Sequence, residues 1–288
     1  MIGYAYRVEQ AGPRSLREMA VALERLPLGQ RYFPGAPAGL RLEDSNVAGD
    51  HVLMSFSRPR RGHGPGSLGD DAPLGDIDLG EGKRFGEDTA LAYDPASGFA
   101  AIQFNQYGPR VSHIQEYLTA ADLALGIPDG AGMGFTLAPH YKTDAAARLG
   151  RMRLVKKIEF TISVPGVNQA DFDAGRSVGG ILRSNLPGGI QTISVELSAG
   201  RGREGALALN AAQAIIADLQ RLGGDLTAAT VTGKPEARGA RDKVNLVDER
   251  LSRQVDIRPN LGHRMALPER WIALGESLRH WQATNQLQ

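Results

Sequence analysis

Three residues in the first third of the chain match the metal-binding motif of restriction-type nucleases. Such enzymes hold magnesium between a carboxylate and a Glu-x-Lys pair, whose lysine approaches the scissile phosphate. Glu81-Gly82-Lys83 supplies the pair, and Asp70, Asp71 or Asp78 upstream could supply the carboxylate. The surrounding segment is rich in glycine and has no strand pattern, whereas the nuclease needs the pair on a strand. A magnesium-dependent nuclease is therefore kept only as an alternative.

Other sequence patterns of catalytic and cofactor sites are absent or lack the structural elements that such sites need. Residues 64–69 spell G-x-G-x-x-G, but a dinucleotide site needs this loop to run from a strand into a helix, and no amphipathic helix follows. The six histidines are scattered, and no two have the spacing H-x-x-x-H. The absence of cysteine excludes disulfides, thiolate metal sites and a thiol nucleophile. We expect no catalytic residue, no metal, no cofactor and no enzyme activity.

Clusters of basic residues give a more informative signal. The formal net charge is only +1, so clustering implies an uneven distribution of charge. Lysine and arginine clusters neutralise nucleic-acid phosphates without reading the bases. The candidate DNA contacts are Arg58, Arg60, Arg61, Arg151, Arg153, Lys156, Lys157, Arg238, Arg241 and Lys243. The alternative is that these residues lie in ordinary solvated loops, and charge alone favours that alternative.

Two of these clusters, around Lys156 and around Arg241, lie on predicted strands or beside them. Strict alternation along a strand over 152–164 places Arg153 and Lys156 on opposite faces, so that neither face is uniformly basic. This weakens the prediction of a single basic patch on that strand. The third cluster, which also contains Lys234, lies in the turn between the predicted strands 226–231 and 243–246.

Strand and helix patterns alternate along the chain. Ser15 can cap a helix that Pro27 ends, and the clearest hairpin joins residues 89–93 to 99–104 through a turn rich in Asp, Pro and Gly. The stretch 58–84 has no repeating pattern. Further strands are predicted at 2–8, 51–57, 152–164, 190–197, 226–231 and 243–246, and further helices at 111–125, 144–150, 169–183, 204–222 and 268–281.

This order of elements predicts an α+β fold with mixed or antiparallel sheets and flanking helices. The pattern changes near residue 145, so we expect two domains, at residues 1–145 and 146–288. No segment reaches the ~18–20 consecutive apolar residues that a membrane helix needs. Residues 1–9 also lack the pattern of a signal peptide. We therefore expect a cytoplasmic protein that is not inserted in a membrane.

The last predicted helix carries large apolar side chains on one face. They are Trp271, Leu274, Leu278 and Trp281. Packing onto the chain's own core is the first interpretation of this face. Contact with a partner or a second copy is the other, because aromatic anchors dominate protein interfaces.

Three segments resemble a bacterial family without assigned function that is itself similar to RexA, the cytoplasmic component of a phage-exclusion system. They are residues 85–95 (FGEDTALAYDP), 99–109 (FAAIQFNQYGP) and 114–118 (IQEYL). The resemblance implies a homodimeric, two-domain protein that binds double-stranded DNA independently of sequence and pairs with a membrane-protein effector. It assigns no individual contact residue.

The resulting expectation is a non-catalytic, sequence-independent DNA-binding component of an anti-phage system of the phage-exclusion type. One alternative is a protein-interaction or scaffold component of a defence operon, which would dock through Trp271 and Trp281. The other is the nuclease built around Glu81 and Lys83.

Overall fold

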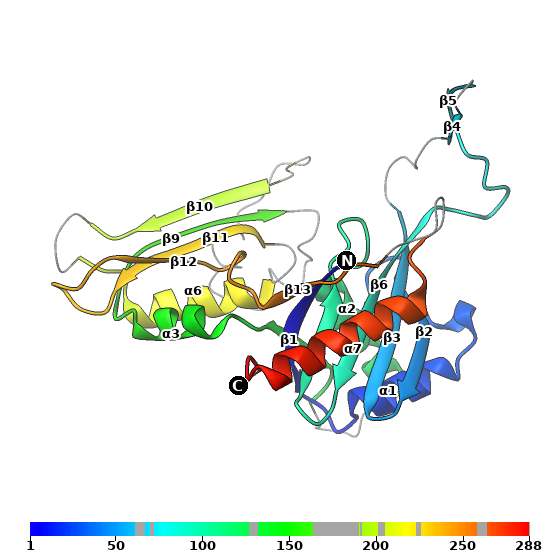
Figure 1. Cartoon of the computed structure of the whole chain (residues 1–288), viewed down its shortest axis with the longest axis horizontal. Coiled ribbons are helices and arrows are strands. Elements are labelled where there is room, and N and C mark those ends of the chain that lie inside the picture. Colours follow the sequence, from blue (N-terminus) through cyan, green and yellow to red (C-terminus); the bar gives the residue numbers. More distant parts are fainter. Residues whose placement is uncertain are drawn as a thin grey trace.

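The computed structural model describes residues 1–60, 67–69, 72–126, 132–163, 190, 192–200, 205–222, 226–257 and 264–287. Within these residues, five α-helices flank two antiparallel sheets of seven and four strands (Figure 1). This confirms the predicted α+β fold with flanking helices. The predicted helix at 169–183 lies outside the described residues.

The first sheet contains strands from both ends of the chain. Its order is β13-β1-β7-β6-β3-β2, and β8 pairs with the second half of β1. All of its pairings are antiparallel, with Tyr4 opposite Ile102 and Met54 opposite Leu91. The strands are β1 Ile2–Gln10, β2 Arg41–Ala48, β3 His51–Pro59, β6 Gly86–Asp94, β7 Phe99–Gln103, β8 Phe135–Pro139 and β13 Ser252–Gln254.

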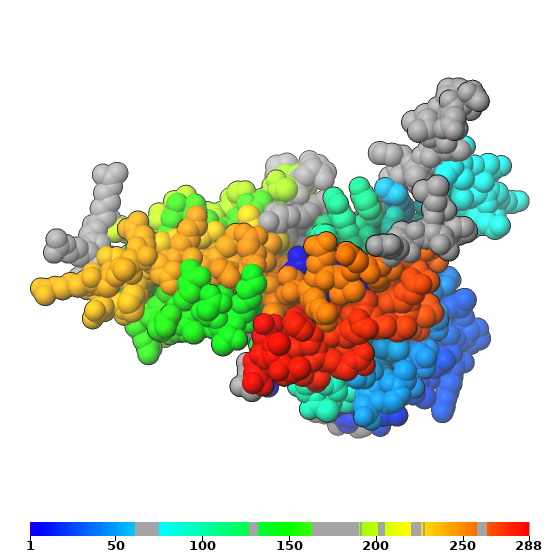
Figure 2. All heavy atoms as spheres, in the orientation of Figure 1, coloured from blue at the N-terminus to red at the C-terminus, as the bar shows by residue number. Residues whose placement is uncertain are grey.

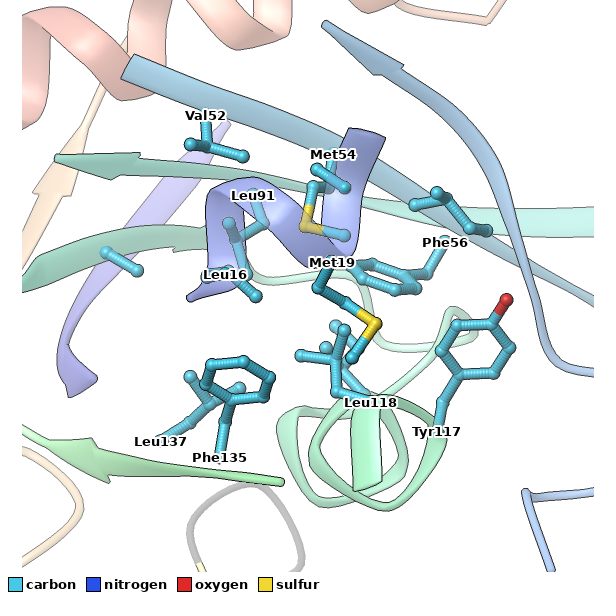
Figure 3. Close-up of a cluster of buried hydrophobic side chains, with 14 of the residues drawn as sticks. Leu16, Met19, Val52, Met54, Phe56, Leu91, Tyr117, Leu118, Phe135 and Leu137 are labelled. Carbon is cyan, nitrogen blue, oxygen red and sulfur yellow. The ribbon is translucent and has the colours of Figure 1, made fainter. Parts of the chain in front are cut away.

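Two helices cover one face of this sheet. They are α1, Leu16–Glu24, and α2, Val111–Ala124. The predicted start of α1 is confirmed, because Ser15 and Glu18 form a reciprocal capping box. Figure 3 shows the core that results, in which side chains of α1, α2 and β8 point toward those of β3 and β6.

The last helix, α7 (Leu267–Ala283), covers the opposite face of the first sheet. Small side chains of the sheet face it, and the large side chains of α7 fill the space that they leave. The sheet contributes Ala5, Ala90, Ala92 and Ala101, and the helix contributes Trp271, Leu274, Leu278 and Trp281. All four of these helix residues are buried, and Trp271 Nε1 donates a hydrogen bond of 3.1 Å to the Met54 carbonyl. They pack on the chain's own core, as the first interpretation predicted. The prediction that these side chains are exposed for contact with a partner is not supported.

The second sheet has the order β10-β9-β11-β12. Its strands are β9 Leu154–Ser163, β10 Thr192–Ser198, β11 Leu226–Lys234 and β12 Asp242–Asn245. Two helices, α3 (Thr143–Arg151) and α6 (Leu209–Leu222), pack on the same apolar face. The opposite face carries polar side chains along β10 and β9, and no helix of the described residues covers it (Figure 1).

The chain passes from the first sheet to the second after β8 and then returns. The sequence assigned β13 and α7 to residues 146–288, but both contact the first sheet. The alanine-lined face of that sheet is apolar and needs a cover, which the tryptophan helix provides. Within the described part of the chain, no helix has both the length and the apolar composition needed to cross a membrane.

The irregular stretch predicted at 58–84 contains a short hairpin. Its strands are β4, Ser67–Gly69, and β5, Ala72–Gly75. The described residues of the G-x-G-x-x-G match therefore lie on a strand and do not begin a helix. The described part of the match therefore does not have the strand-to-helix geometry of a dinucleotide-binding loop.

Candidate nucleic-acid interface

A basic hollow lies at one end of the second sheet. It has a volume of about 710 Å³ and is lined by five cationic side chains and a single anionic one, Glu159. The cationic residues are Lys156, Lys157, Lys234, Arg241 and Lys243. They come from the start of β9, the end of β11 and the start of β12. The β11–β12 hairpin, orange in Figure 2, projects at the end of the molecule away from the first sheet.

A β-bulge brings the two neighbouring lysines of β9 to the same hollow. Lys157 pairs with Thr232, but the next residue of β11, Gly233, pairs with Val155. Lys156 is thus the extra residue, and a bulge re-aims the side chains around it. Strict alternation would have placed the two lysines on opposite faces. Because of the bulge, Lys156 and Lys157 both line the hollow, and the expectation that alternation separates the basic residues of this strand is wrong here.

One row of residues crosses the four strands at the hollow. Ser198 pairs with Lys157, Lys157 pairs with Thr232, and Thr232 pairs with Lys243. Residues paired in antiparallel strands place their side chains on the same face. The Thr232 hydroxyl therefore stands between Lys157 and Lys243, and the Ser198 hydroxyl stands on the other side of Lys157. Both hydroxyls can donate to phosphate oxygens.

The charge of Lys157 is largely compensated. Its Nζ lies 2.8 Å from Glu159 and 3.1 Å from Glu196. Hydrogen bonds to these two carboxylates raise the pKa of Lys157 above its ordinary value. Lys156 Nζ in turn donates to the Gly205 carbonyl. These contacts fix both lysine side chains along the wall of the hollow.

The remaining cations supply the excess positive charge. Lys234 is half-buried, and Arg241 and Lys243 are exposed. No ion pair with another described residue involves any of the three. Because Glu159 is already bound to Lys157, no carboxylate that lines the hollow offsets their charge.

Asp242 lies between Arg241 and Lys243 in the sequence, but Arg148 on α3 binds it. The guanidinium donates to both carboxylate oxygens, with Nη2–Oδ1 at 2.7 Å and Nε–Oδ2 at 3.0 Å. These hydrogen bonds lower the pKa of Asp242 below its ordinary value. Arg148 also contacts Glu249 at 3.3 Å. The pair ties the base of the β11–β12 hairpin to α3.

The other predicted contacts of the second half do not line the hollow. Arg151 and Arg153 are exposed where α3 leads into β9, and Arg238 is exposed in the β11–β12 turn. Four predicted contacts, Lys156, Lys157, Arg241 and Lys243, do come together there. Lys234 was placed in a basic cluster but not among the candidate contacts, and the structure adds it. The hydroxyls of Ser198 and Thr232 were missed, because only strand register aligns them with the lysines.

The first basic cluster belongs to the other sheet. Arg58 lies at the end of β3, and its Nη2 donates to the Tyr107 carbonyl at 3.3 Å. Arg60 stacks over the Tyr107 ring, 4.3 Å from its centroid, and lies 3.5 Å from Glu87. Arg61 lies outside the described residues. The end of β3 and the β11–β12 turn are on opposite sides of the molecule (Figure 1), so the three clusters do not form one surface.

The residues of the alternative nuclease motif occupy a turn. Glu81 and Lys83 are exposed, and the Lys83 amide donates to the Gly80 carbonyl at 3.4 Å. Neither residue lies on a strand. In the described parts of the chain, no group of three or more His, Asp or Glu side chains is arranged to hold a metal ion.

The basic hollow can hold anions but has little means of reading bases. Ammonium, guanidinium and hydroxyl donors line it, and none of the described residues that line it is aromatic. Base recognition by stacking requires aromatic side chains, whereas phosphate binding requires only such donors and positive charge. No protein-family model matches this chain, and no curated protein matches it.

Proposed function

We propose that this protein holds double-stranded DNA by its phosphates in the basic hollow, without reading base sequence and without catalysis. The observation that carries the proposal is the meeting of two separate basic clusters, around Lys157 and around Arg241, at one end of the second sheet. Phosphate contacts of this kind position a protein on a duplex and carry no sequence information.

We further propose that this binding serves an anti-phage system of the phage-exclusion type. The support is the resemblance of residues 85–95, 99–109 and 114–118 to the RexA-like family. A homodimer and a membrane-protein effector follow from the same resemblance. A neighbouring gene that encodes a multi-span membrane protein would support the effector. No specific observation favours the scaffold or the nuclease instead.

The test is DNA binding as a function of salt. Labelled duplexes of equal length and different sequence should bind with equal affinity in a fluorescence-anisotropy titration. The logarithm of the binding constant should fall linearly with the logarithm of salt concentration, by about 0.9 for each phosphate neutralised. Parallel reactions with magnesium and with a chelator, analysed on a denaturing gel, separate binding from cleavage.

A double variant locates the binding surface. Arg241→Gln with Lys243→Gln should weaken binding on the order of tenfold or more and should reduce the salt slope by roughly one for each charge removed. Arg17→Gln with Arg25→Gln is the matched control, because it removes the same charge from exposed positions at α1. The proposal fails if binding does not depend on salt, if no duplex binds at low salt, or if both double variants weaken binding equally.

A further inference from the structure

A second hollow on the first sheet is lined by arginines. It has a volume of about 260 Å³ and lies where β2 and β3 meet the start of β6. Four arginines line it, against one carboxylate, Glu43; they are Arg41, Arg58, Arg84 and Arg264. This arginine hollow shares no lining residue with the basic hollow, and the strands that carry the two hollows belong to different sheets, which lie apart in Figure 1.

The one carboxylate in the arginine hollow is already bound. Glu43 Oε2 accepts hydrogen bonds from Ser57 Oγ at 2.6 Å and from Arg41 Nε at 2.9 Å. Burial of the Glu43 carboxyl raises its pKa, but these hydrogen bonds outweigh burial, and the pKa lies below its ordinary value. Glu43 is therefore anionic at neutral pH and compensates Arg41. The positive charge of the other three arginines exceeds the negative charge within the hollow.

The arginines are held to different degrees. Arg58 is fixed from behind, because its guanidinium contacts the Tyr107 carbonyl at 3.3 Å and the His113 ring at 3.2 Å. Arg264 is 76% exposed and reaches Asp88 only at 3.7 Å. Arg84 is also exposed. The hollow thus has one fixed guanidinium on its wall and two at its mouth that can close on an anion.

Close backbone packing shapes the wall of the hollow. Gly39 has a φ of +74°, and a Cβ at this position would lie 2.8 Å from Cδ of Pro59. A glycine is required here for both the left-handed conformation and the close approach. Tyr32 and Phe85 add flat aromatic surfaces to the same hollow.

A neighbouring hollow of about 400 Å³ shares Glu43 and Arg264 with the arginine hollow. Its other lining residues include Asp44, which is exposed, and Asp88, whose carboxylate is already bound by Arg270 in a buried ion pair. Carboxylates accept hydrogen bonds from hydroxyl and amino groups. The two hollows together therefore offer cationic donors for a phosphate and, beside them, the Asp44 carboxylate as an acceptor for a polar group of the molecule that carries it.

We propose that the arginine hollow binds a phosphate monoester whose polar, hydroxyl-bearing body extends into the neighbouring hollow. Guanidinium groups suit this ligand, because their paired N–H donors match phosphate oxygens and bind them with charge-assisted hydrogen bonds. A free nucleoside monophosphate and the 5′-phosphorylated end of a nucleic acid strand share this chemistry. The proposal does not depend on DNA binding at the basic hollow.

Two pairs of ligands test the proposal by isothermal titration calorimetry. The first pair is adenosine monophosphate and adenosine, and the second is a tetranucleotide with and without a 5′-phosphate. The protein carries Arg241→Gln and Lys243→Gln, so that the basic hollow contributes little to oligonucleotide binding. The phosphorylated member of at least one pair should bind on the order of tenfold tighter or more. A preference in the first pair indicates a free nucleotide, and a preference in the second indicates a strand end.

Adding Arg84→Gln with Arg264→Gln should abolish that preference for the phosphorylated ligand. Both side chains are exposed, so the variant should fold, and its thermal melting curve checks this. Arg17→Gln with Arg25→Gln should leave the preference intact. The proposal is overturned if neither pair shows a preference for phosphate, or if the preference survives the loss of Arg84 and Arg264.

Discussion

Arg270 on α7 and Asp88 at the start of β6 form a buried ion pair, with Nη2 and Oδ2 2.5 Å apart. Arg270 also donates to Gln103 Oε1 at 3.0 Å, and the same oxygen accepts from the Ala90 amide at 3.2 Å. Asp88 and Gln103 lie in the segments that resemble the RexA-like family. In this structure their side chains anchor the last helix to the first sheet, and they do not form an exposed site.

Asp88→Asn should destabilise the protein by about 3–5 kcal/mol, because it leaves the Arg270 guanidinium buried without a counter-charge. Urea denaturation at neutral pH measures the change in the free energy of unfolding. Glu87→Gln is the control, because its ion pair with Arg60 is more exposed and should contribute at most about 1 kcal/mol. A similarly small decrease in the free energy of unfolding for both variants would contradict a structural role for the buried ion pair.

Ala101→Leu should destabilise the docking of α7 by about 1–3 kcal/mol, because the added atoms would collide with the large side chains of that helix. The chain has two tryptophans, and both lie buried on α7. Tryptophan emission therefore reports on this helix alone, and a shift to longer wavelength is expected in the variant. Ala283→Leu, at an exposed position of α7, should leave the emission unchanged. An unchanged spectrum for Ala101→Leu would show that the interface can accommodate the larger side chain.

Gly233→Ala should distort the sheet beside the basic hollow. A Cβ on Gly233 would lie 2.9 Å from Sδ of Met152 and 3.1 Å from the Leu154 carbonyl oxygen. We expect a loss of about 1–3 kcal/mol in the free energy of unfolding, together with weaker DNA binding. Gly200→Ala is the matched control in the same hollow, because no other atom lies within 4 Å of a Cβ there. Equal stability of the two variants in urea would argue against the bulge geometry.

Asp242→Asn should lower stability at neutral pH but not in acid. Arg148 lowers the pKa of Asp242 in the folded protein relative to the unfolded chain. The stabilisation is therefore complete above the unfolded value of about 3.9 and is lost as the pH falls through the lower folded value. Melting temperatures of the two proteins should differ at pH 7 and converge as the pH falls below the folded pKa of Asp242. Asp50→Asn, in the exposed turn between β2 and β3, should show no such pH-dependent difference. A difference for Asp242→Asn that persists in acid would exclude the ion pair as its cause.

Features that depend on neighbours along the chain can be predicted from the amino-acid sequence. The Ser15 cap, the hairpin of β6 and β7, and the apolar face of α7 all follow from spacing and turn residues within a few positions. Such patterns also predicted the α+β class, because enough strands and helices show their own period. They did not predict β2, β8 or β13. They showed which basic residues lie close together along the chain, but not which of these clusters lie close together in the folded protein.

Which basic clusters come together depends on how distant strands pair. Lys157 faces Lys243 across β11 because of strand register, and Lys156 joins them because of a one-residue bulge. Register and bulges depend on pairing between distant segments, and a shift of one residue moves a side chain to the other face. The return of β13 and α7 to the first sheet likewise depended on an apolar face 150 or more residues away. The local sequence of α7 predicts what that helix must bury but not where it packs.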